Sequence, residues 1–137
     1  MKKAIIIYQS KKGTTRKLGE EIQSVLASKL IATDIQALEE CKGLDVSAYD
    51  YVFLGCWTKG LMFFAQHPDK VWNDYVPSLR FSQDSKMVFF TSYKIATGSM
   101  FSQMKKSLPR EHPSIYGKIK SRDGNLNSSS AELLNWL

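Results

Sequence analysis

Long apolar runs are missing from this sequence. No segment approaches the roughly 18 consecutive apolar residues that a membrane-spanning helix requires, so we expect no membrane span. The first apolar run, residues 4–8, is too short for the apolar region of a signal peptide, and no cleavage-site pattern follows it. These absences exclude an integral membrane protein and predict a soluble protein with a cytoplasmic localisation.

Cysteine is equally scarce, with only Cys41 and Cys56 in 137 residues. The two cysteines fit no metal-ligand spacing, and they are too few for the disulfide framework of a small secreted domain. Cys56 closes an apolar run, so we expect a buried and inert thiol. The sequence therefore predicts reduced cysteines and no zinc or iron–sulfur site.

The surroundings of the two histidines give no sign of acid–base catalysis. His67 and His112 each precede a proline, lie far apart in the sequence, and have no paired carboxylate or serine pattern around them. A histidine that acts as an acid or base in catalysis needs such partners. We therefore expect both to be surface loop residues.

Positive charge is what the chain has in excess. The formal net charge is +6, and the basic residues are spread over several short groups and form no single block. A spread of this kind is typical of a solvated surface. Since no nucleic-acid-binding motif accompanies the charge, we expect no nucleic acid partner.

Apolar periodicity predicts one domain, residues 1–137, in which strands and helices alternate. The 43% hydrophobic content is enough for a core. The runs 50–56 and 86–91 are apolar without alternation, as in strands buried on both faces of a parallel sheet. The expected strands are 4–8, 31–35, 50–56, 86–91 and 114–119, and the expected helices are 15–30, 68–75, 99–108 and 131–137. Five strand–helix units predict an α/β fold with a doubly wound parallel sheet between two layers of helices.

Two smaller features refine this reading. Leu18, Ile22, Val25, Leu26 and Leu30 are spaced for one buried face of the first helix. Residues 125–130, Asn-Leu-Asn-Ser-Ser-Ser, are typical of a loop with the N-cap of the last helix.

Three loops leave the carboxyl edge of the predicted sheet, where doubly wound folds bind ligands. Residues 10–15 gather hydroxyl groups, backbone N–H groups and a helix N-terminus, which suit a phosphate. Residues 57–63 and 92–98 bring Trp57 and Tyr93, which could sandwich a planar ring, with Gly60 and Gly98 allowing close approach. The edge therefore predicts a site for a flat, phosphorylated ligand.

The same loops resemble those of flavodoxins. Residues 10–15, Ser-Lys-Lys-Gly-Thr-Thr, resemble the flavodoxin phosphate loop, usually Thr/Ser-x-Thr-Gly-x-Thr, and residues 54–57 with 59–60 resemble the second flavin loop. Residues 91–93 fall where flavodoxins have their last ring-contacting segment. The resemblance implies a flavodoxin-like fold with sheet order 2-1-3-4-5 and FMN as cofactor. The cofactor-binding residues it implies are Ser10, Lys11, Lys12, Gly13, Thr14, Thr15, Cys56, Trp57, Thr58, Lys59, Gly60, Thr91, Ser92, Tyr93 and Gly98.

Within that set the resemblance implies two roles. The phosphate would be held by Ser10, Lys12, Gly13, Thr14 and Thr15, and Trp57, Gly60 and Tyr93 would lie against the ring. Simpler readings remain open: residues 13–15 could be only a turn and helix N-cap, and Trp57 could be a core aromatic. The apolar cluster 62–64 could belong to the core, cover the flavin edge or meet a partner.

The function that the resemblance implies is electron transfer, with FMN shuttling electrons between a reductase and an acceptor enzyme. A small FMN-dependent NAD(P)H or quinone reductase is an alternative, but 137 residues leave little material for a second substrate site. A flavin-free, protein-binding module is another. A phosphorelay receiver domain is excluded, because it needs acidic residues where the chain has Gln9 and Ser10, and an aspartate where it has Cys56 and Trp57.

Two departures from flavodoxins stand out. Lys12 replaces a hydroxyl residue of the phosphate loop, and the chain is basic whereas flavodoxins are typically acidic. Lys59 and Lys94 are candidates to lie near the ring and ease its last reduction step. With Lys11 and Lys12, they also predict a docking surface that attracts redox partner proteins with an acidic patch.

Overall fold

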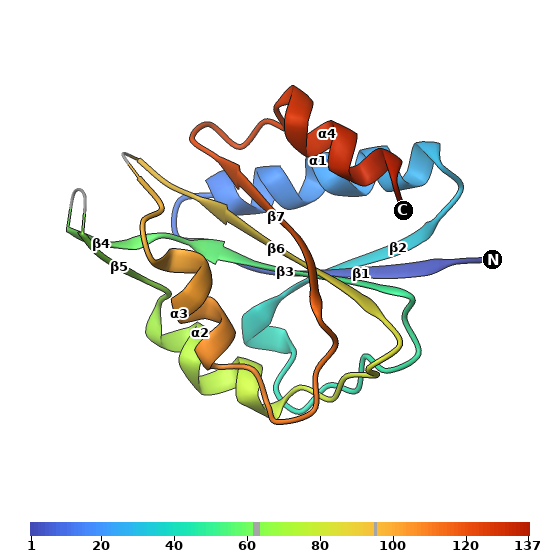
Figure 1. The fold of residues 1–137 in the computed structure, drawn as a ribbon, viewed down its shortest axis with the longest axis horizontal. Coiled ribbons are helices and arrows are strands. Elements are labelled where there is room, and N and C mark those ends of the chain that lie inside the picture. Colours follow the sequence, from blue (N-terminus) through green and yellow to red (C-terminus); the bar gives the residue numbers. More distant parts are fainter. Residues whose placement is uncertain (62–63, 95) are drawn as a thin grey trace.

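The computed structural model of the chain describes residues 1–61, 64–94 and 96–137. Within these residues the centre is a five-stranded sheet in which all neighbouring strands run parallel (Figure 1). In sheet order the strands are β2 (Ala32–Ala37), β1 (Lys3–Gln9), β3 (Tyr51–Trp57), β6 (Lys86–Ser92) and β7 (Ile115–Ser121). Counted along the chain this is the order 2-1-3-4-5, which confirms the predicted doubly wound sheet.

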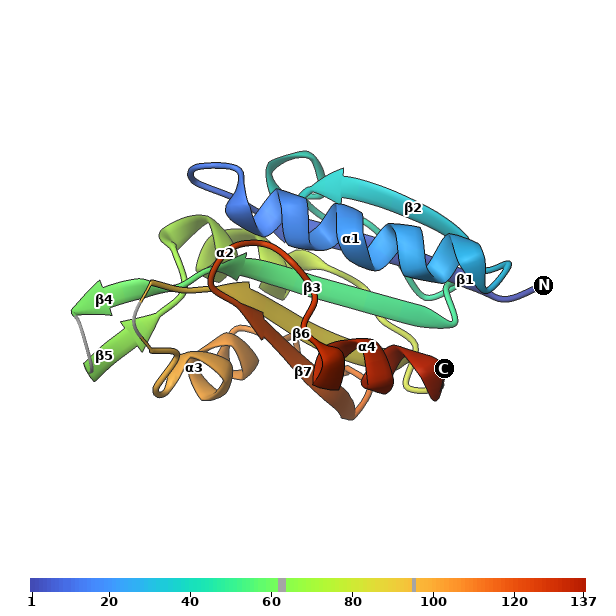
Figure 2. The same ribbon diagram turned by 90° about the horizontal axis from the view of Figure 1, so that it is seen from above.

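Helices cover both faces of the sheet and complete the predicted three layers (Figures 1 and 2). On one face lie α1 (Thr14–Ser28) and α4 (Ser128–Asn135), and on the other lie α2 (Lys70–Tyr75) and α3 (Met100–Lys106). Every expected helix is present, and α2 and α3 are shorter than predicted. The predicted N-cap of the last helix is Asn127, whose side chain accepts a hydrogen bond from the Ser130 N–H at 2.8 Å.

The apolar runs of the sequence are buried because both faces of the sheet are covered. Alternate residues of one strand serve different halves of the core: Ile5 and Ile7 pack in the cluster that contains Trp72, and Ile6 packs in the cluster that contains Leu18. All five side chains are at most 1% exposed. A sheet with two apolar faces explains why these runs do not alternate between apolar and polar residues.

The end of α1 corrects the sequence analysis. Leu30 was expected on the buried helix face but is 81% exposed, because the helix ends at Ser28. The N–H of Leu30 bonds to the Ala27 carbonyl and the N–H of Ile31 to the Leu26 carbonyl, which is a Schellman motif. Leu30 has a φ of 60° at the position where glycine is usual, and Ile31 takes the buried place.

The connection after β3 is a second correction. The sequence analysis expected a loop over residues 57–63, whereas the structure has an antiparallel hairpin of β4 (Lys59–Leu61) and β5 (Phe64–His67). His67 is exposed as predicted but ends a strand of this hairpin. Met62 and Phe63 of the predicted apolar cluster lie outside the described residues.

Two single turns of 3-10 helix complete the described elements. The turn η1 (Leu38–Glu40) follows β2 and stands where the second α-helix of a five-unit alternation would be, and η2 (Val76–Ser78) follows α2. Leu38 of η1 is fully buried against the sheet. In the described part of the chain, no helix has the length and apolar composition needed to cross a membrane.

Candidate functional site

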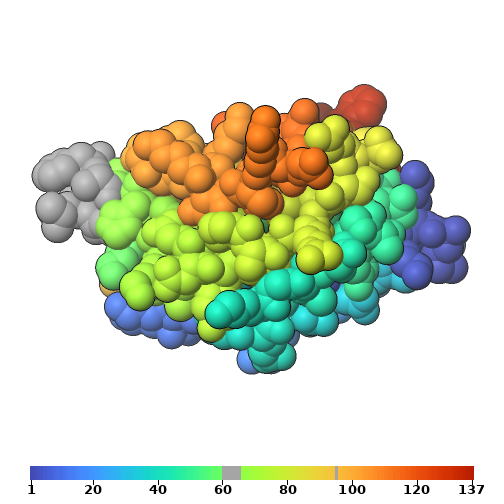
Figure 3. Space-filling view, turned by 90° about the horizontal axis from the view of Figure 1, so that it is seen from below, coloured from blue at the N-terminus to red at the C-terminus, as the bar shows by residue number. Residues whose placement is uncertain are grey.

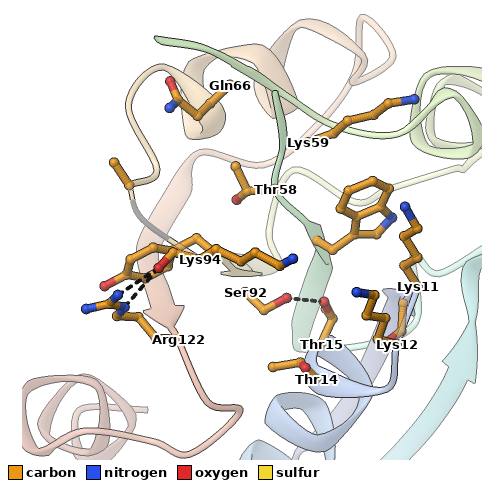
Figure 4. A pocket seen from close by; sticks show the side chains of 14 residues that line it. Lys11, Lys12, Thr14, Thr15, Thr58, Lys59, Gln66, Ser92, Lys94 and Arg122 are labelled. Atoms are coloured by element: carbon orange, nitrogen blue, oxygen red, sulfur yellow. Dashed lines mark hydrogen bonds between the residues drawn. The ribbon is translucent and has the colours of Figure 1, made fainter. Parts of the chain in front are cut away.

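A cavity of about 490 Å³ lies where β1, β3 and β6 end (Figure 4). This is the edge at which doubly wound sheets bind ligands. It is lined by Ser10, Lys11, Lys12, Thr14, Thr15, Trp57, Thr58, Lys59, Gln66, Ser92, Tyr93, Lys94, Ala96 and Arg122. The structure therefore brings residues from all three predicted loops to one place, together with residues that the sequence analysis did not select.

The loop between β1 and α1 forms one wall of the cavity. Ser10 Oγ accepts hydrogen bonds from the N–H of Gly13 at 3.0 Å and of Arg16 at 3.4 Å, which holds the turn closed. Gly13 adopts a φ of 93°, a left-handed conformation that other residues resist. The first N–H groups of a helix have no partner within the helix, so Thr14 and Thr15 bring such donors to the cavity wall.

Three hydrogen bonds of hydroxyl groups join the loops behind this wall. Thr15 Oγ1 lies 2.6 Å from Ser92 Oγ in a buried hydrogen bond, shown as a dashed line in Figure 4. Thr91 Oγ1 donates to the Cys56 carbonyl at 2.6 Å and lies 2.9 Å from Thr58 Oγ1. These bonds tie β3, β6 and the start of α1 together, so the cavity floor is a connected hydrogen-bonded layer.

Trp57 is held in place from two sides. Its indole N–H donates to Asp69 Oδ2 at 3.2 Å, and Lys11 Nζ lies 4.8 Å from the centre of its ring. Asp69 also accepts a hydrogen bond from Gln9 Nε2 at 3.5 Å. Trp57 is half-buried and lines the cavity, so it is an oriented aromatic wall and is not sealed in the core.

Tyr93 supplies the second aromatic side chain. Its backbone N–H donates to the Ser121 carbonyl at 3.1 Å, which extends the pairing of β6 with β7 by one residue. Lys120 Nζ lies 6.0 Å from the centre of its ring. Tyr93 and Trp57 thus line the same cavity from two neighbouring strands.

Four of the predicted site residues do not line the cavity. They are Gly13, Cys56, Thr91 and Gly98. Gly13 shapes the phosphate-loop turn and Thr91 supports Thr58, so both act from behind the wall. Gly60 belongs to β4, and its surroundings lie outside what the structure describes.

Gly98 and Cys56 each have a structural role outside the cavity lining. Gly98 has a φ of 49°, and a Cβ atom there would collide with Gln66 Oε1, so this glycine leaves room for a side chain of the cavity wall. Cys56 is fully buried, and burial, followed by the nearby Asp69 carboxylate, raises the pKa of its thiol well above the ordinary value. Burial likewise raises the pKa of Cys41 to about 11, with Glu40 and Glu39 adding to the shift.

The structure adds three residues, Gln66, Ala96 and Arg122, to the cavity lining, together with Lys94, which the sequence predicted near the ring but not among the cofactor-binding residues. Arg122 follows the last strand of the sheet, and its guanidinium donates two hydrogen bonds to the Lys94 carbonyl, at 2.8 and 3.1 Å (Figure 4). The rule that ligands bind beyond strand ends applies to this loop too, so the sequence carried a signal for Arg122. Gln66 comes from the hairpin, which the sequence analysis did not predict.

The lining is strongly positive. Lys11, Lys12, Lys59, Lys94 and Arg122 contribute to it, and among the described residues it contains no aspartate or glutamate. Hydroxyl groups, helix N–H groups and cations at one wall suit a phosphate, and the two aromatic side chains suit a planar ring. The donor set therefore fits an anionic, aromatic ligand.

Comparisons with known proteins concern the family and the fold of the chain. Residues 5–92 match the family model described as a flavodoxin domain. The chain superposes on the two-electron reduced flavodoxin of Megasphaera elsdenii with a TM-score of 0.73 at 18% identity, covering 96% of this chain and 94% of that chain. No curated protein sequence matches the chain.

Two further solved structures are similar. Oxidised flavodoxin 1 from Bacillus cereus gives a TM-score of 0.71 at 16% identity, over 98% of this chain and 93% of that one. A short-chain flavodoxin associated with a non-canonical PDU bacterial microcompartment gives 0.73 at 12% identity, over 99% and 93%. These likenesses show the fold, and the family model shows the family. The chain belongs to the flavodoxin domain family, whose members are FMN-binding electron-transfer proteins.

Proposed function

We propose that this protein is an electron carrier of the cytoplasm, which takes electrons from a reductase and passes them to an acceptor enzyme. The observation that carries the proposal is the convergence, in one cavity, of the residue 10–15 loop with Trp57 and Tyr93. The loop offers what a phosphate monoester needs, and the aromatic side chains offer what a flat ring needs. FMN has both parts.

The phosphate is assigned to the loop that begins α1. Ser10, Gly13, Thr14 and Thr15 would surround it, because they bring helix N–H groups and hydroxyl groups to one wall. Lys12 replaces a hydroxyl residue of the family pattern, but it is exposed and lines the cavity, so its ammonium adds charge without closing the site. The dianionic phosphate would be neutralised there.

The ring is assigned to the space beside Trp57 and Tyr93. The hydrogen bond of Trp57 to Asp69 fixes the orientation of the indole before any ligand binds, which lowers the entropy lost on binding. Lys94 extends into the cavity from the loop after β6, with its carbonyl held by Arg122 (Figure 4). Bound FMN supplies reversible electron uptake, and the protein's part is to orient the ring, limit water and set the local charge.

A carrier suits this site better than a reductase with two substrates. The volume of about 490 Å³ is ordinary for one small-molecule ligand and leaves little space for a nicotinamide beside the ring. Neither histidine lines the cavity, and the Cys56 thiol is sealed beneath it. Among the described residues, the cavity lining therefore offers no histidine or thiol for acid–base or nucleophilic chemistry.

The test starts with the visible absorption spectrum of the freshly purified protein. The proposal expects a flavin spectrum with about one FMN per chain, and FMN, not FAD, in the supernatant after heat release. The bound FMN should be reduced by light and a sacrificial donor, and should then reduce a haem protein in a bimolecular reaction. A colourless protein that binds no added FMN would favour the flavin-free module, and NAD(P)H oxidation by the protein alone would favour the reductase.

A further inference from the structure

The positive charge of the chain is concentrated in one part of the fold. Residues 86–122 contain eight of the nineteen lysines and arginines and one of the thirteen acidic residues. The rest of the chain contains eleven basic and twelve acidic residues and so carries a formal charge of −1. The whole excess of positive charge thus belongs to residues 86–122, which form β6, α3, β7 and the loops beside them, although the charges look scattered along the sequence.

All eight of these cations are exposed. We call seven of them the basic face: Lys94, Lys105, Lys106, Arg110, Lys118, Lys120 and Arg122. Lys86 is left out, because it lies over the ring of Tyr116, whose hydroxyl reaches the Trp136 carbonyl at the end of α4. Figure 3 shows α3 and the segment that follows it, in orange, at the surface of the molecule. The edge strand β7 exposes Lys118 and Lys120, and Lys118 lies on the side of the sheet that α3 covers.

Contacts between these elements make the face continuous with the cavity. Lys118 Nζ lies 5.9 Å from the ring centre of Phe101 on α3, and Lys120 Nζ lies 6.0 Å from that of Tyr93 in the cavity wall. Arg122 bonds to the Lys94 carbonyl at the cavity rim. A macromolecule seated on this face would therefore reach the cavity mouth.

Protection of the sheet edge explains only part of this charge. Lysines on an edge strand prevent pairing with a second sheet, which accounts for Lys118 and Lys120. Lys105 and Lys106 lie in the last turn of α3, where cations also stabilise the helix dipole, and Arg110 lies on a loop. Edge protection therefore does not account for these three cations.

From this arrangement we propose that the basic face is the docking surface for an acidic partner protein that exchanges electrons at the cavity mouth. The proposal rests on the proposed electron-carrier function and specifies the chemistry of its partner. Complementary charge would steer the partner and bring its redox centre to the exposed edge. Single-stranded nucleic acid fits less well, because Lys118 already lies over the ring of Phe101 on α3, which leaves this ring less open for base stacking.

The experiment measures binding first, without electron transfer. The FMN-loaded, oxidised protein is titrated by calorimetry with oxidised cytochrome b5, an acidic haem protein, and with cytochrome c, a basic one. The proposal expects binding to cytochrome b5 that weakens as salt rises, and no measurable binding to cytochrome c. The Lys105→Glu/Lys106→Glu/Lys118→Glu variant should bind cytochrome b5 about tenfold or more weakly at low ionic strength.

Two further variants make the result specific. The matched Lys2→Glu/Lys29→Glu/Lys42→Glu variant changes the net charge equally near β1 and β2, and should lose less than about threefold. The same α3 and β7 positions changed to Gln should give an intermediate affinity, and they keep the test open where the Glu variant folds poorly. Equal losses in the two Glu variants would leave only a net-charge effect and overturn the proposal.

Two readouts separate this inference from the proposed function. In stopped-flow mixing, the photoreduced protein should reduce cytochrome b5 at a rate that falls as salt rises. The Lys105→Glu/Lys106→Glu/Lys118→Glu variant should react more slowly than the wild type at low ionic strength. Its affinity for FMN should equal that of the wild type. A protein that binds no FMN would refute the electron carrier, while the cytochrome b5 titration would still report on the basic face. Tighter binding of a 20-base duplex DNA than of cytochrome b5 at about 0.15 M ionic strength would overturn the acidic-protein partner.

Discussion

Thr15 Oγ1 and Ser92 Oγ share a buried hydrogen bond of 2.6 Å that joins the first turn of α1 to the end of β6, 77 residues away. Thr15 is fully buried and Ser92 is 5% exposed. Each residue also lines the cavity. The bond therefore couples the loop assigned to the phosphate with the loop assigned to the ring.

Removing one hydroxyl of this pair should destabilise the protein more than removing both. Thr15→Val or Ser92→Ala alone leaves a buried hydroxyl unpaired, at a cost of about 1–3 kcal/mol, whereas the double variant leaves none. A double-mutant cycle by urea unfolding of the FMN-free protein measures the coupling. Strictly additive losses would show that the two side chains do not depend on each other.

Ser10→Ala should weaken FMN and spare riboflavin. The hydroxyl holds the Gly13 and Arg16 N–H groups, so its loss loosens the turn that faces the phosphate, at a cost of about 1–3 kcal/mol in FMN binding. Fluorescence titration with both flavins measures the difference. Ser24→Ala, at an exposed position of α1, is the control and should bind FMN as the wild type does. An equal loss of affinity for FMN and for riboflavin would show that this loop does not bind the phosphate.

Trp57→Phe should abolish most of the quenching of tryptophan fluorescence by FMN. The protein has two other tryptophans: Trp72 is buried and donates to the Met104 carbonyl, and Trp136 is 72% exposed. Neither of them lines the cavity. Trp136→Phe is the matched control and should keep the quenching. Unchanged quenching in the Trp57→Phe variant would show that the flavin ring does not lie beside Trp57.

Lys94→Gln should make bound FMN harder to reduce. A positive charge in the cavity wall stabilises the negative charge that the flavin gains, by about 1 kcal/mol at ~4 Å in water. Its loss should lower the midpoint potential by roughly 20–40 mV, measured by dye equilibration. Lys106→Gln on α3 is the control and should leave the potential within about 10 mV, since Lys106 does not line the cavity. Equal shifts would indicate an effect of net charge alone.

Leu30→Gly should stabilise the protein by about 0.5–1 kcal/mol. Leu30 has a φ of 60°, which is strained for a residue with a side chain, and its 81% exposure means that little burial is lost. Thermal unfolding measures the gain. Leu30→Ala keeps the strain and should give none, so a gain in both variants would assign the effect to the loss of an exposed apolar side chain.

The sequence by itself determined the strands and helices of the five-stranded sheet and the edge of the sheet where the candidate site lies. Unalternated apolar runs such as 50–56 are buried on both faces, because a parallel sheet between helices offers no wet face. The local composition of residues 10–15 was enough to predict the turn at the start of α1, because hydroxyl and glycine preferences act over a few residues. These signals are local, and so they could be read without tertiary structure.

Only the tertiary structure decided which distant residues meet. The partnership of Thr15 with Ser92, the entry of Gln66 and Arg122 into the cavity wall and the joining of Lys118, Lys120 and Lys94 into one face depend on strand order and on the β4–β5 hairpin. The exposure of Leu30 likewise followed from where α1 ends, which periodicity does not state. Hydrophobic spacing specifies which side of an element is buried, but contacts between elements arise only when the whole chain packs.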